Sequence, residues 1–278
     1  MTHTSDFGSQ IAKNGFKNEA LVITKFNNWK SDEDSQGWLE QMGYDLTKIV
    51  LIEAIKGSEF MSRLKTQGMK FGLGSVKTDV TVLVKIYLKD MVEPQNISVK
   101  LVSKDYNPKG KYSGFNQIDK REIDNYIELW KIPDNLVKTL KYFTGKLLPY
   151  IPTSRDSRRM YLDEMNESYV KELVEFFEKN KVLIIGDIIR GRGALSAEWM
   201  LVALNKKSSE TVKETIWTFK SINEVMNYYS QGGVKISKDG NFSIGRISVQ
   251  RKGGDGGKPT AQQLQFKFDP LELLFPKM

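Results

Sequence analysis

Along the first fifty residues, apolar side chains recur at the three- and four-residue spacing of a helix face. The clearest helix-like stripe consists of Phe16, Ala20, Ile23, Phe26 and Asn27. Residues 35–42 and 44–52 continue in the same style, so we expect helices and no strand in this part of the chain. Residues 57–77 contain Gly and Lys without a regular period, which predicts a long surface loop.

Two later segments have the composition of strands. Asp79–Leu88 and Gln95–Lys104 are rich in β-branched residues, and their apolar and polar positions partly alternate. Because the short segment Lys89–Pro94 joins them, we expect an antiparallel hairpin.

The rest of the chain mixes helical and extended patterns. Helices are expected at residues 119–130, 136–143, 164–179 and 222–229, the last preceded by a capping box of Ser221 and Glu224. Strands are expected at residues 182–189, 198–204, 215–219, 234–237, 242–251 and 263–268. This order predicts an α/β fold with a central mixed β-sheet flanked by helices. Because no Pro- or Ser-rich linker clearly divides the chain, residues 1–278 are expected to form a single domain.

Composition narrows the chemistry. The only histidine, His3, lies in a polar N-terminal segment, and the chain contains no cysteine. Serine hydrolase triads, histidine zinc sites and thiolate chemistry are therefore excluded, which leaves carboxylates, lysines, hydroxyls and a hard metal ion. The 42 basic against 34 acidic residues favour a polyanionic partner such as nucleic acid, although many unrelated proteins share such an excess.

Membranes and nucleotides are not expected partners. No segment approaches the roughly 18 apolar residues that span a bilayer, and the N-terminus is polar, so we expect a cytoplasmic protein. Two Gly-rich segments imitate nucleotide-binding loops. GRGALS (191–196) precedes a predicted strand instead of a helix, and GGDGGKPT (253–260) has Pro259 where a hydroxyl is required, so no nucleotide cofactor is expected.

Polar residues of the predicted hairpin suggest a metal-dependent phosphodiesterase site. Asp79 begins the first strand, and Ser98 and Lys100 share one face of the second because side chains alternate along a strand. Asp79 and a strand carbonyl, such as that of Val99, would hold Mg²⁺, while Lys100 would orient water and offset charge on the phosphate. An Asp and a Lys at this spacing also occur by chance, usually as a surface ion pair, so spacing alone leaves both interpretations open.

At these residues the chain resembles a known family. KTDVTV (77–82) and NISVKLVSK (96–104) are similar to the Asp…(Asp/Glu/Gln)-x-Lys core of the PD-(D/E)xK nuclease superfamily. Further blocks resemble type II restriction endonucleases of the HinP type, which cleave GCGC. These blocks are FKNE (16–19), GFNQIDK (114–120), FTGKLLPY (143–150), DIIRGRG with AEWMLVA (187–203), INEV (222–225), IGRISVQRKGGDGG (244–257) and LQFKFDPLEL (264–273).

The resemblance covers nearly the whole chain, with longer loops at residues 58–74 and 104–113. It implies a restriction-endonuclease-like fold and Mg²⁺-dependent cleavage of double-stranded DNA at GCGC, after the first G. Ser98 stands where the family has Gln, and a hydroxyl is a weaker metal ligand than a carboxylate. Glu19 in the first helix is therefore a candidate further ligand, with a solvated helix residue as the alternative.

Contact with GCGC requires donors to guanine and acceptors for cytosine. One group of candidates near the C-terminus consists of Arg246, Gln250, Arg251, Lys252 and Asp255. A second group, in the GFNQIDK block, consists of Phe115, Asn116, Gln117 and Lys120. The resemblance implies that Phe115 inserts into the minor groove. The alternatives are a solvated basic loop for the first group and a local cap on the core for Phe115.

Two other functions also fit. A DNA-binding protein with the same fold would have lost cleavage through the change at Ser98, and a junction or repair nuclease would cut by DNA structure without a fixed sequence. The oligomeric state is open as well. Palindromic DNA suits a two-fold dimer, whereas the resemblance favours a monomer that nicks each strand in turn.

Overall fold

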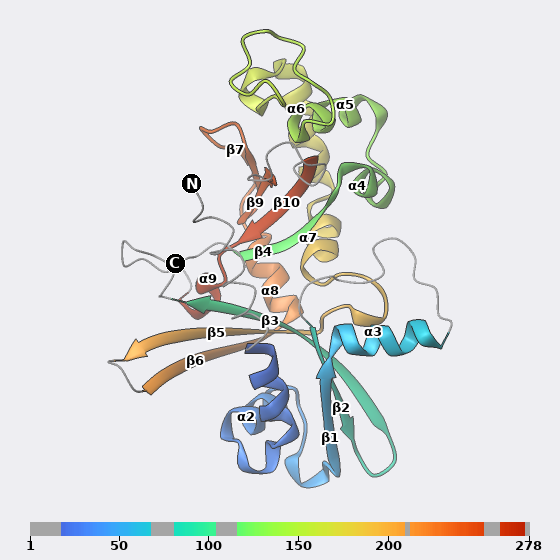
Figure 1. Ribbon diagram of the computed structural model, residues 1–278, viewed down its shortest axis with the longest axis vertical. Helices are drawn as coiled ribbons and strands as arrows, with labels where there is room; N and C mark the ends of the chain where they lie inside the picture. The colour runs from blue at the N-terminus through green and yellow to red at the C-terminus, as the bar shows by residue number, and fades with distance from the viewer. Residues whose placement is uncertain (1–17, 68–80, 104–115, 209–211, 253–261, 276–278) are drawn as a thin grey trace.

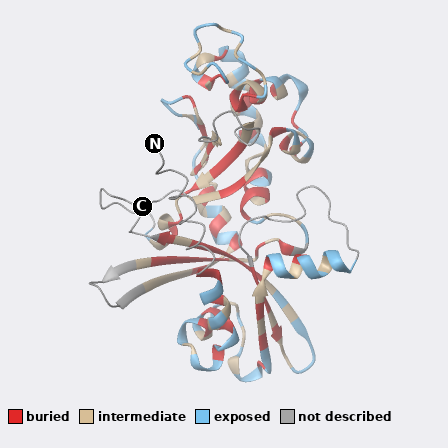
Figure 2. Cartoon of the chain, viewed as in Figure 1, coloured by how far each residue is buried: buried red, intermediate tan, exposed pale blue. Residues whose placement is uncertain are grey.

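The computed structural model describes residues 18–67, 81–103, 116–208, 212–252 and 262–275. Their strands form two five-stranded sheets (Figure 1). The first sheet runs across the lower half of this view, and the second lies above it beside most of the helices from the middle of the chain. Buried residues follow the strands of both sheets and the helices between them (Figure 2).

The first sheet is mixed and contains the predicted hairpin. In spatial order its strands are β1 (Leu51–Lys56), β2 (Thr81–Tyr87), β3 (Val92–Ser103), β5 (Trp199–Ser208) and β6 (Val212–Ser221). All neighbours are antiparallel except β3 and β5, which are parallel. The antiparallel pairing of β2 with β3 confirms the hairpin, and β5 and β6 confirm the strands expected there.

Two expectations for the first third of the chain are wrong. The helical pattern expected through residue 52 is interrupted by β1, in which only Ile52 and Ala54 are buried, so the alternation is too short to detect and the pairing with β2 decides the strand. The segment expected to be a loop at residues 57–77 begins with helix α3 (Gly57–Thr66). Its apolar stripe is weak because only Gly57 and Met61 are buried.

Helices cover one face of the first sheet. Residues 18–27 are helical, and α2 (Glu33–Gln41) follows between two 3₁₀ turns, η1 (Trp29–Ser31) and η2 (Leu46–Lys48). Val22, Phe26 and Leu39 pack with Ile97 and Val99 of β3 in one buried cluster. This layer is fixed to the sheet edge by Asn27, whose Oδ1 accepts the Ala54 N–H at 2.8 Å and whose Nδ2 donates to the Ala54 carbonyl at 3.2 Å.

The second sheet is antiparallel throughout. In spatial order its strands are β4 (Asn116–Glu122), β10 (Gln263–Phe268), β9 (Ile247–Arg251), β8 (Phe242–Ile244) and β7 (Val234–Ile236). β10 has the predicted bounds. The helix expected from residue 119 is wrong over its first four residues, which belong to β4. The strand expected at residues 242–251 is instead a tight hairpin of β8 and β9, because Gly245 adopts φ +58°.

The remaining helices pack on the second sheet and between the sheets. They are α4 (Ile123–Trp130), α5 (Asp134–Thr144), α6 (Glu167–Lys179), α7 (Lys181–Ile189), α8 (Ile222–Tyr229) and α9 (Leu271–Leu274), with 3₁₀ turns η4 (Leu162–Glu164) and η5 (Gly193–Leu195). The capping box of Ser221 and Glu224 begins α8 as expected. The chain is therefore built as predicted, with a central mixed sheet that has helices on both faces.

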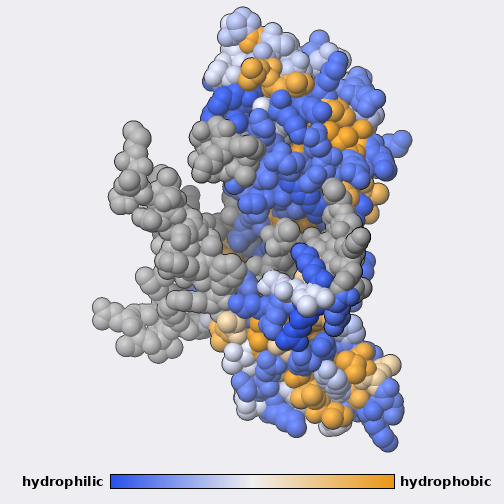
Figure 3. Space-filling view, turned by 45° about the vertical axis from the view of Figure 1, so that its right-hand side comes forward, coloured by the Kyte–Doolittle hydropathy of each residue, from blue (hydrophilic) through white to orange (hydrophobic). Residues whose placement is uncertain are grey.

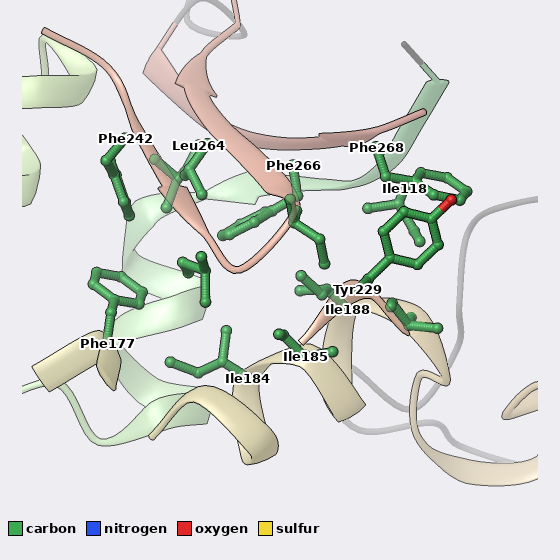
Figure 4. Packing of buried hydrophobic residues seen from close by; sticks show 14 of the residues in the cluster. Ile118, Phe177, Ile184, Ile185, Ile188, Tyr229, Phe242, Leu264, Phe266 and Phe268 are labelled. Carbon is green, nitrogen blue, oxygen red and sulfur yellow. The ribbon is translucent and has the colours of Figure 1, made fainter. Parts of the chain in front are cut away.

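Residues 182–189, expected as a strand, form α7. Ile184, Ile185 and Ile188 of this helix are buried in one cluster with Phe266 and Phe268 of β10, and Figure 4 shows them pointing toward that strand. A short, mostly apolar run has no clear period, so the sequence does not distinguish a buried helix from a buried strand. No helix in the described ranges is long and apolar enough to cross a membrane. On the side shown in Figure 3, a broad hydrophilic area lies on the upper half of the described surface.

Candidate active site and DNA-binding surface

Ser98 and Lys100 lie on the same face of β3, at the centre of the first sheet. In the register, Ser98 lies opposite Thr81 and Met200, and Lys100 lies opposite Val202. The two polar residues are 1% and 6% exposed, so both are enclosed by the protein. Ser98 Oγ has no hydrogen-bond partner among the residues that the structure describes, which is unusual for a buried hydroxyl.

Glu19, in the helix at residues 18–27, lies close enough to Lys100 for the two charges to interact. It lies three residues before Val22 and seven before Phe26, on the stripe that this helix turns toward the protein, and it is 6% exposed. Burial raises the pKa of the Glu19 carboxyl, and the ammonium groups of Lys56 and Lys100 act in the opposite direction. Glu19 Oε1 also lacks a hydrogen-bond partner within the described part of the chain. Lys100 thus acts on the Glu19 carboxyl, and Ser98 lies two residues from Lys100 on the same face of β3.

The other two residues of the predicted metal site contribute differently. Asp79 lies outside the described residues. The Val99 side chain packs into the apolar cluster with Ile97, on the opposite face of β3 from Ser98, so only the Val99 carbonyl is available for the role expected of it. The described ranges contain no group of three or more acidic or histidine side chains able to hold a metal ion.

One face of the second sheet carries a row of glutamines, of which Gln265 is 8% exposed. Gln250 Nε2 on β9 donates to Gln265 Oε1 on β10 at 3.1 Å, and Gln265 Nε2 donates to Gln117 Oε1 on β4 at 2.6 Å. The alternating residues Leu264 and Phe266 of β10 point the other way, into the core (Figure 4). The amides therefore form a polar ladder across three strands, on the face that the core does not use.

Two lysines accompany this ladder. Lys120 lies opposite Gln265, and Lys267 lies opposite Gln117 in the β4–β10 register. Lys267 is half-buried and forms no ion pair with any described residue, and burial lowers the pKa of its ammonium group. The polar face consists of Gln117, Lys120, Gln250, Gln265 and Lys267. Gln265 and Lys267 were not predicted from the sequence, although their alternation with Leu264, Phe266 and Phe268 was the available signal.

The structure describes two of the four remaining predicted DNA contacts. Phe115 and Asp255 lie outside the described residues, and Asn116 is the first residue of β4. Lys252 directly follows β9, and its N–H donates to the Gln263 carbonyl. DNA contact by these four residues therefore stays a prediction.

The two predicted arginines lie away from the polar face. Arg246, in the turn between β8 and β9, donates to Gln231, lies 3.6 Å from Glu272 and stacks over the Tyr228 ring. Arg251 follows Gln250 and therefore points to the opposite face, where it lies 3.6 Å from Asp156 and its side chain is 8% exposed. The polar face therefore includes neither arginine.

The fold and a family model place the chain among restriction endonucleases. A solved structure with a similar fold is titled as the restriction endonuclease MspI in complex with its cognate DNA; the TM-score is 0.59 over 96% of this chain and 93% of that one, at 15% sequence identity. The family model of the R.HinP1I restriction endonuclease matches residues 42–274, and the chain belongs to this family of type II site-specific DNA nucleases. A comparison with curated proteins finds no match.

Family membership and fold together distinguish between the three functions considered for the sequence. They support the restriction endonuclease over a DNA-binding protein that does not cleave and over a junction or repair nuclease. The resemblance found in the sequence is thereby confirmed at the level of the family.

Proposed function

We propose that this type II restriction endonuclease hydrolyses double-stranded DNA at GCGC, after the first G, at a Mg²⁺ site around Glu19, Ser98 and Lys100. The observation that supports the site is the pair of buried oxygen atoms, Glu19 Oε1 and Ser98 Oγ, without hydrogen-bond partners among the described residues and close to a lysine. Oxygen ligands of this kind suit a hard divalent cation.

Asp79 is the proposed principal ligand. It precedes Thr81 by two residues, and two residues span at most about 7 Å of chain. The pairing of Thr81 with Ser98 therefore supports Asp79 as a ligand. Glu19 and the Val99 carbonyl would complete the ligand set, and Ser98 would contribute its hydroxyl where the family has Gln.

Bound Mg²⁺ would polarise the scissile phosphate and lower the pKa of an attacking water. Lys100 would hold that water by a hydrogen bond and offset the negative charge that develops on the phosphate oxygens. Enclosure strengthens both effects, because a charge acts more strongly where water is excluded. The products would carry 5′-phosphate and 3′-hydroxyl ends.

The polar face of the second sheet is the proposed surface for base contacts. Guanine offers O6 and N7 as acceptors in the major groove, and cytosine offers its N4 amino group as a donor. Lys120 and Lys267 donate only, whereas the three glutamines both donate and accept, so together they match both bases of GCGC. In the complex, a guanine acceptor atom would replace the water that burial has removed from the Lys267 ammonium group. Phe115, Asn116 and the residues near Lys252 would extend the contact.

Digestion of plasmid DNA with the purified protein and Mg²⁺, followed by sequencing of the fragment ends, tests the proposal. Discrete fragments with ends at GCGC are expected, and none with EDTA. Ends at another fixed sequence would refute the GCGC assignment and leave the catalytic site in place. Undiminished digestion by the Glu19→Ala and Lys100→Ala variants would refute the site. Sedimentation of the protein with and without a GCGC duplex would test whether it acts as a monomer.

A further inference from the structure

Strand β4 contains one residue more than the strand it pairs with. In the register, Phe266 lies opposite Asp119 and Lys267 lies opposite Gln117, so Ile118 has no partner on β10. Ile118 and Asp119 are consecutive, yet both are buried, at 1% and 5% exposure. A regular strand turns consecutive side chains to opposite faces, and the extra residue of a β-bulge removes that alternation.

The bulge decides which side chains reach the polar face. Gln117 and Lys120 are three residues apart, so a regular strand would turn them to opposite faces. With Ile118 bulged, Gln117 reaches Gln265 at 2.6 Å, and Lys120 lies opposite the same Gln265. Without the bulge, one of these two residues would be turned to the core.

A buried charge network holds the residues around the bulge. Asp119 Oδ1 accepts the Lys120 N–H at 2.9 Å, and Asp119 Oδ2 lies 3.0 Å from Arg121 Nη2. Arg121 Nη1 in turn lies 3.8 Å from Asp187 Oδ2 on α7. Asp187 also accepts the Trp130 indole N–H at 2.8 Å and the Arg192 Nε–H at 2.5 Å, which anchors the network to α4 and to the segment before β5.

Stability alone does not account for this network. The side chains of Asp187, Asp119 and Arg121 are 1%, 6% and 13% exposed, and removing charges from water offsets most of what their pairing gains. Well-packed apolar residues would serve folding as well, but they would not specify the local register of β4. Charges buried at a bulge do specify it, since slippage by one residue would leave them unpaired.

We propose that Asp119, Arg121 and Asp187 are positioning residues that fix the bulge of β4 and so set the sequence discrimination of the enzyme. This inference rests on the proposed role of the polar face in base contact. None of the three residues touches the DNA in this proposal; they act through Gln117 and Lys120.

The test compares kcat/KM on a duplex carrying the cleavage site of this enzyme with kcat/KM on duplexes changed by one base pair. For Arg121→Gln, we expect the ratio between the two to fall by about tenfold or more, mainly through cleavage of the changed sites. Arg121→Lys, which keeps the charge, should restore part of the ratio. Asp187→Asn, which keeps an acceptor for Trp130, is the milder variant and decides the matter if Arg121→Gln does not fold.

Two controls separate the possible failures. Glu164→Gln breaks a carboxylate network away from β4 that involves Ser154, Arg155 and Tyr161, so it should lower stability without changing the ratio. Gln117→Ala should lower the ratio directly. If Gln117→Ala lowers it while Arg121→Gln and Asp187→Asn leave it unchanged, the positioning role is refuted and the polar face stands. If Gln117→Ala leaves it unchanged, the polar face is refuted and the positioning role with it.

Discussion

Replacing Lys100 by methionine separates the chemistry of the site from folding. The Lys100 side chain is 6% exposed and lies opposite Val202 of β5, so an unbranched apolar residue of similar length fits the same space. The substitution removes the ammonium group and little else. Arginine or alanine would instead overfill the site or leave a cavity.

The expected loss follows from the proposed role of the ammonium group. Removing one preorganised donor that offsets charge in a transition state lowers kcat by about 10²–10³, which corresponds to about 3–4 kcal/mol. Folding is expected to change much less. Relief from burying an ammonium group offsets part of what the loss of its contacts, including the positive charge near Glu19, costs in free energy of unfolding.

Single-turnover cleavage of a duplex with Mg²⁺, a mobility shift in EDTA and a thermal melt measure the three quantities. Lys85→Met is the matched control, since Lys85 pairs with Glu53 on the same sheet and has no proposed part in cleavage. Cleavage by Lys100→Met within tenfold of the original would refute the role of Lys100. A large drop in melting temperature would show instead that its charge serves the fold.

Three further substitutions test the site, the DNA surface and the acid stability of the chain. Ser98→Ala should leave the melting temperature unchanged, because the Ser98 hydroxyl has no hydrogen-bond partner among the described residues. It should raise the Mg²⁺ concentration needed for half-maximal cleavage, and an unchanged Mg²⁺ titration would exclude Ser98 as a ligand. Gln265→Ala should weaken binding to the cognate duplex by about 1–3 kcal/mol without changing the salt dependence, since the amide is neutral; a changed slope in a salt titration would mean that phosphate contacts were lost instead. Burial acts to raise the pKa of Glu164, but hydrogen bonds from Arg155, Tyr161 and Ser154 lower it below the ordinary value. A carboxyl with a lowered pKa stabilises the fold above its unfolded-state pKa and loses that contribution as the pH falls. The Glu164→Gln variant should therefore have a lower melting temperature at neutral pH, and its melting temperature should depend less on pH between about pH 5 and 2. Equal pH dependence of the melting temperature in the two proteins would contradict this.

Local patterns predicted the elements whose residues carry their own signal. Strand β10 has the bounds expected from its alternation, and α8 begins at the expected capping box because Ser221 and Glu224 satisfy each other without help from distant residues. The same alternation placed Ser98 and Lys100 on one face, since that depends only on the geometry of a single strand.

Elements that depend on partners distant in sequence were missed. β1 has only two buried residues and depends on β2 for its hydrogen bonds, while α7 is apolar over most of its surface because neighbours enclose it on several sides. The face of β10 that carries Gln265 and Lys267 was not recognised for a related reason. A strand pattern shows that two faces differ, but not which of them a core or a ligand will cover.

The sequence by itself therefore determined the chemistry that the chain can use, the family to which it belongs and the placement of Ser98 and Lys100 on one face of a strand. Tertiary structure decided the rest. It brought Glu19 from the first helix to Lys100 and joined three glutamines across β9, β10 and β4. It also placed the bulge at Ile118. Each of these depends on contacts between residues far apart in the chain, and no local period or propensity encodes such contacts.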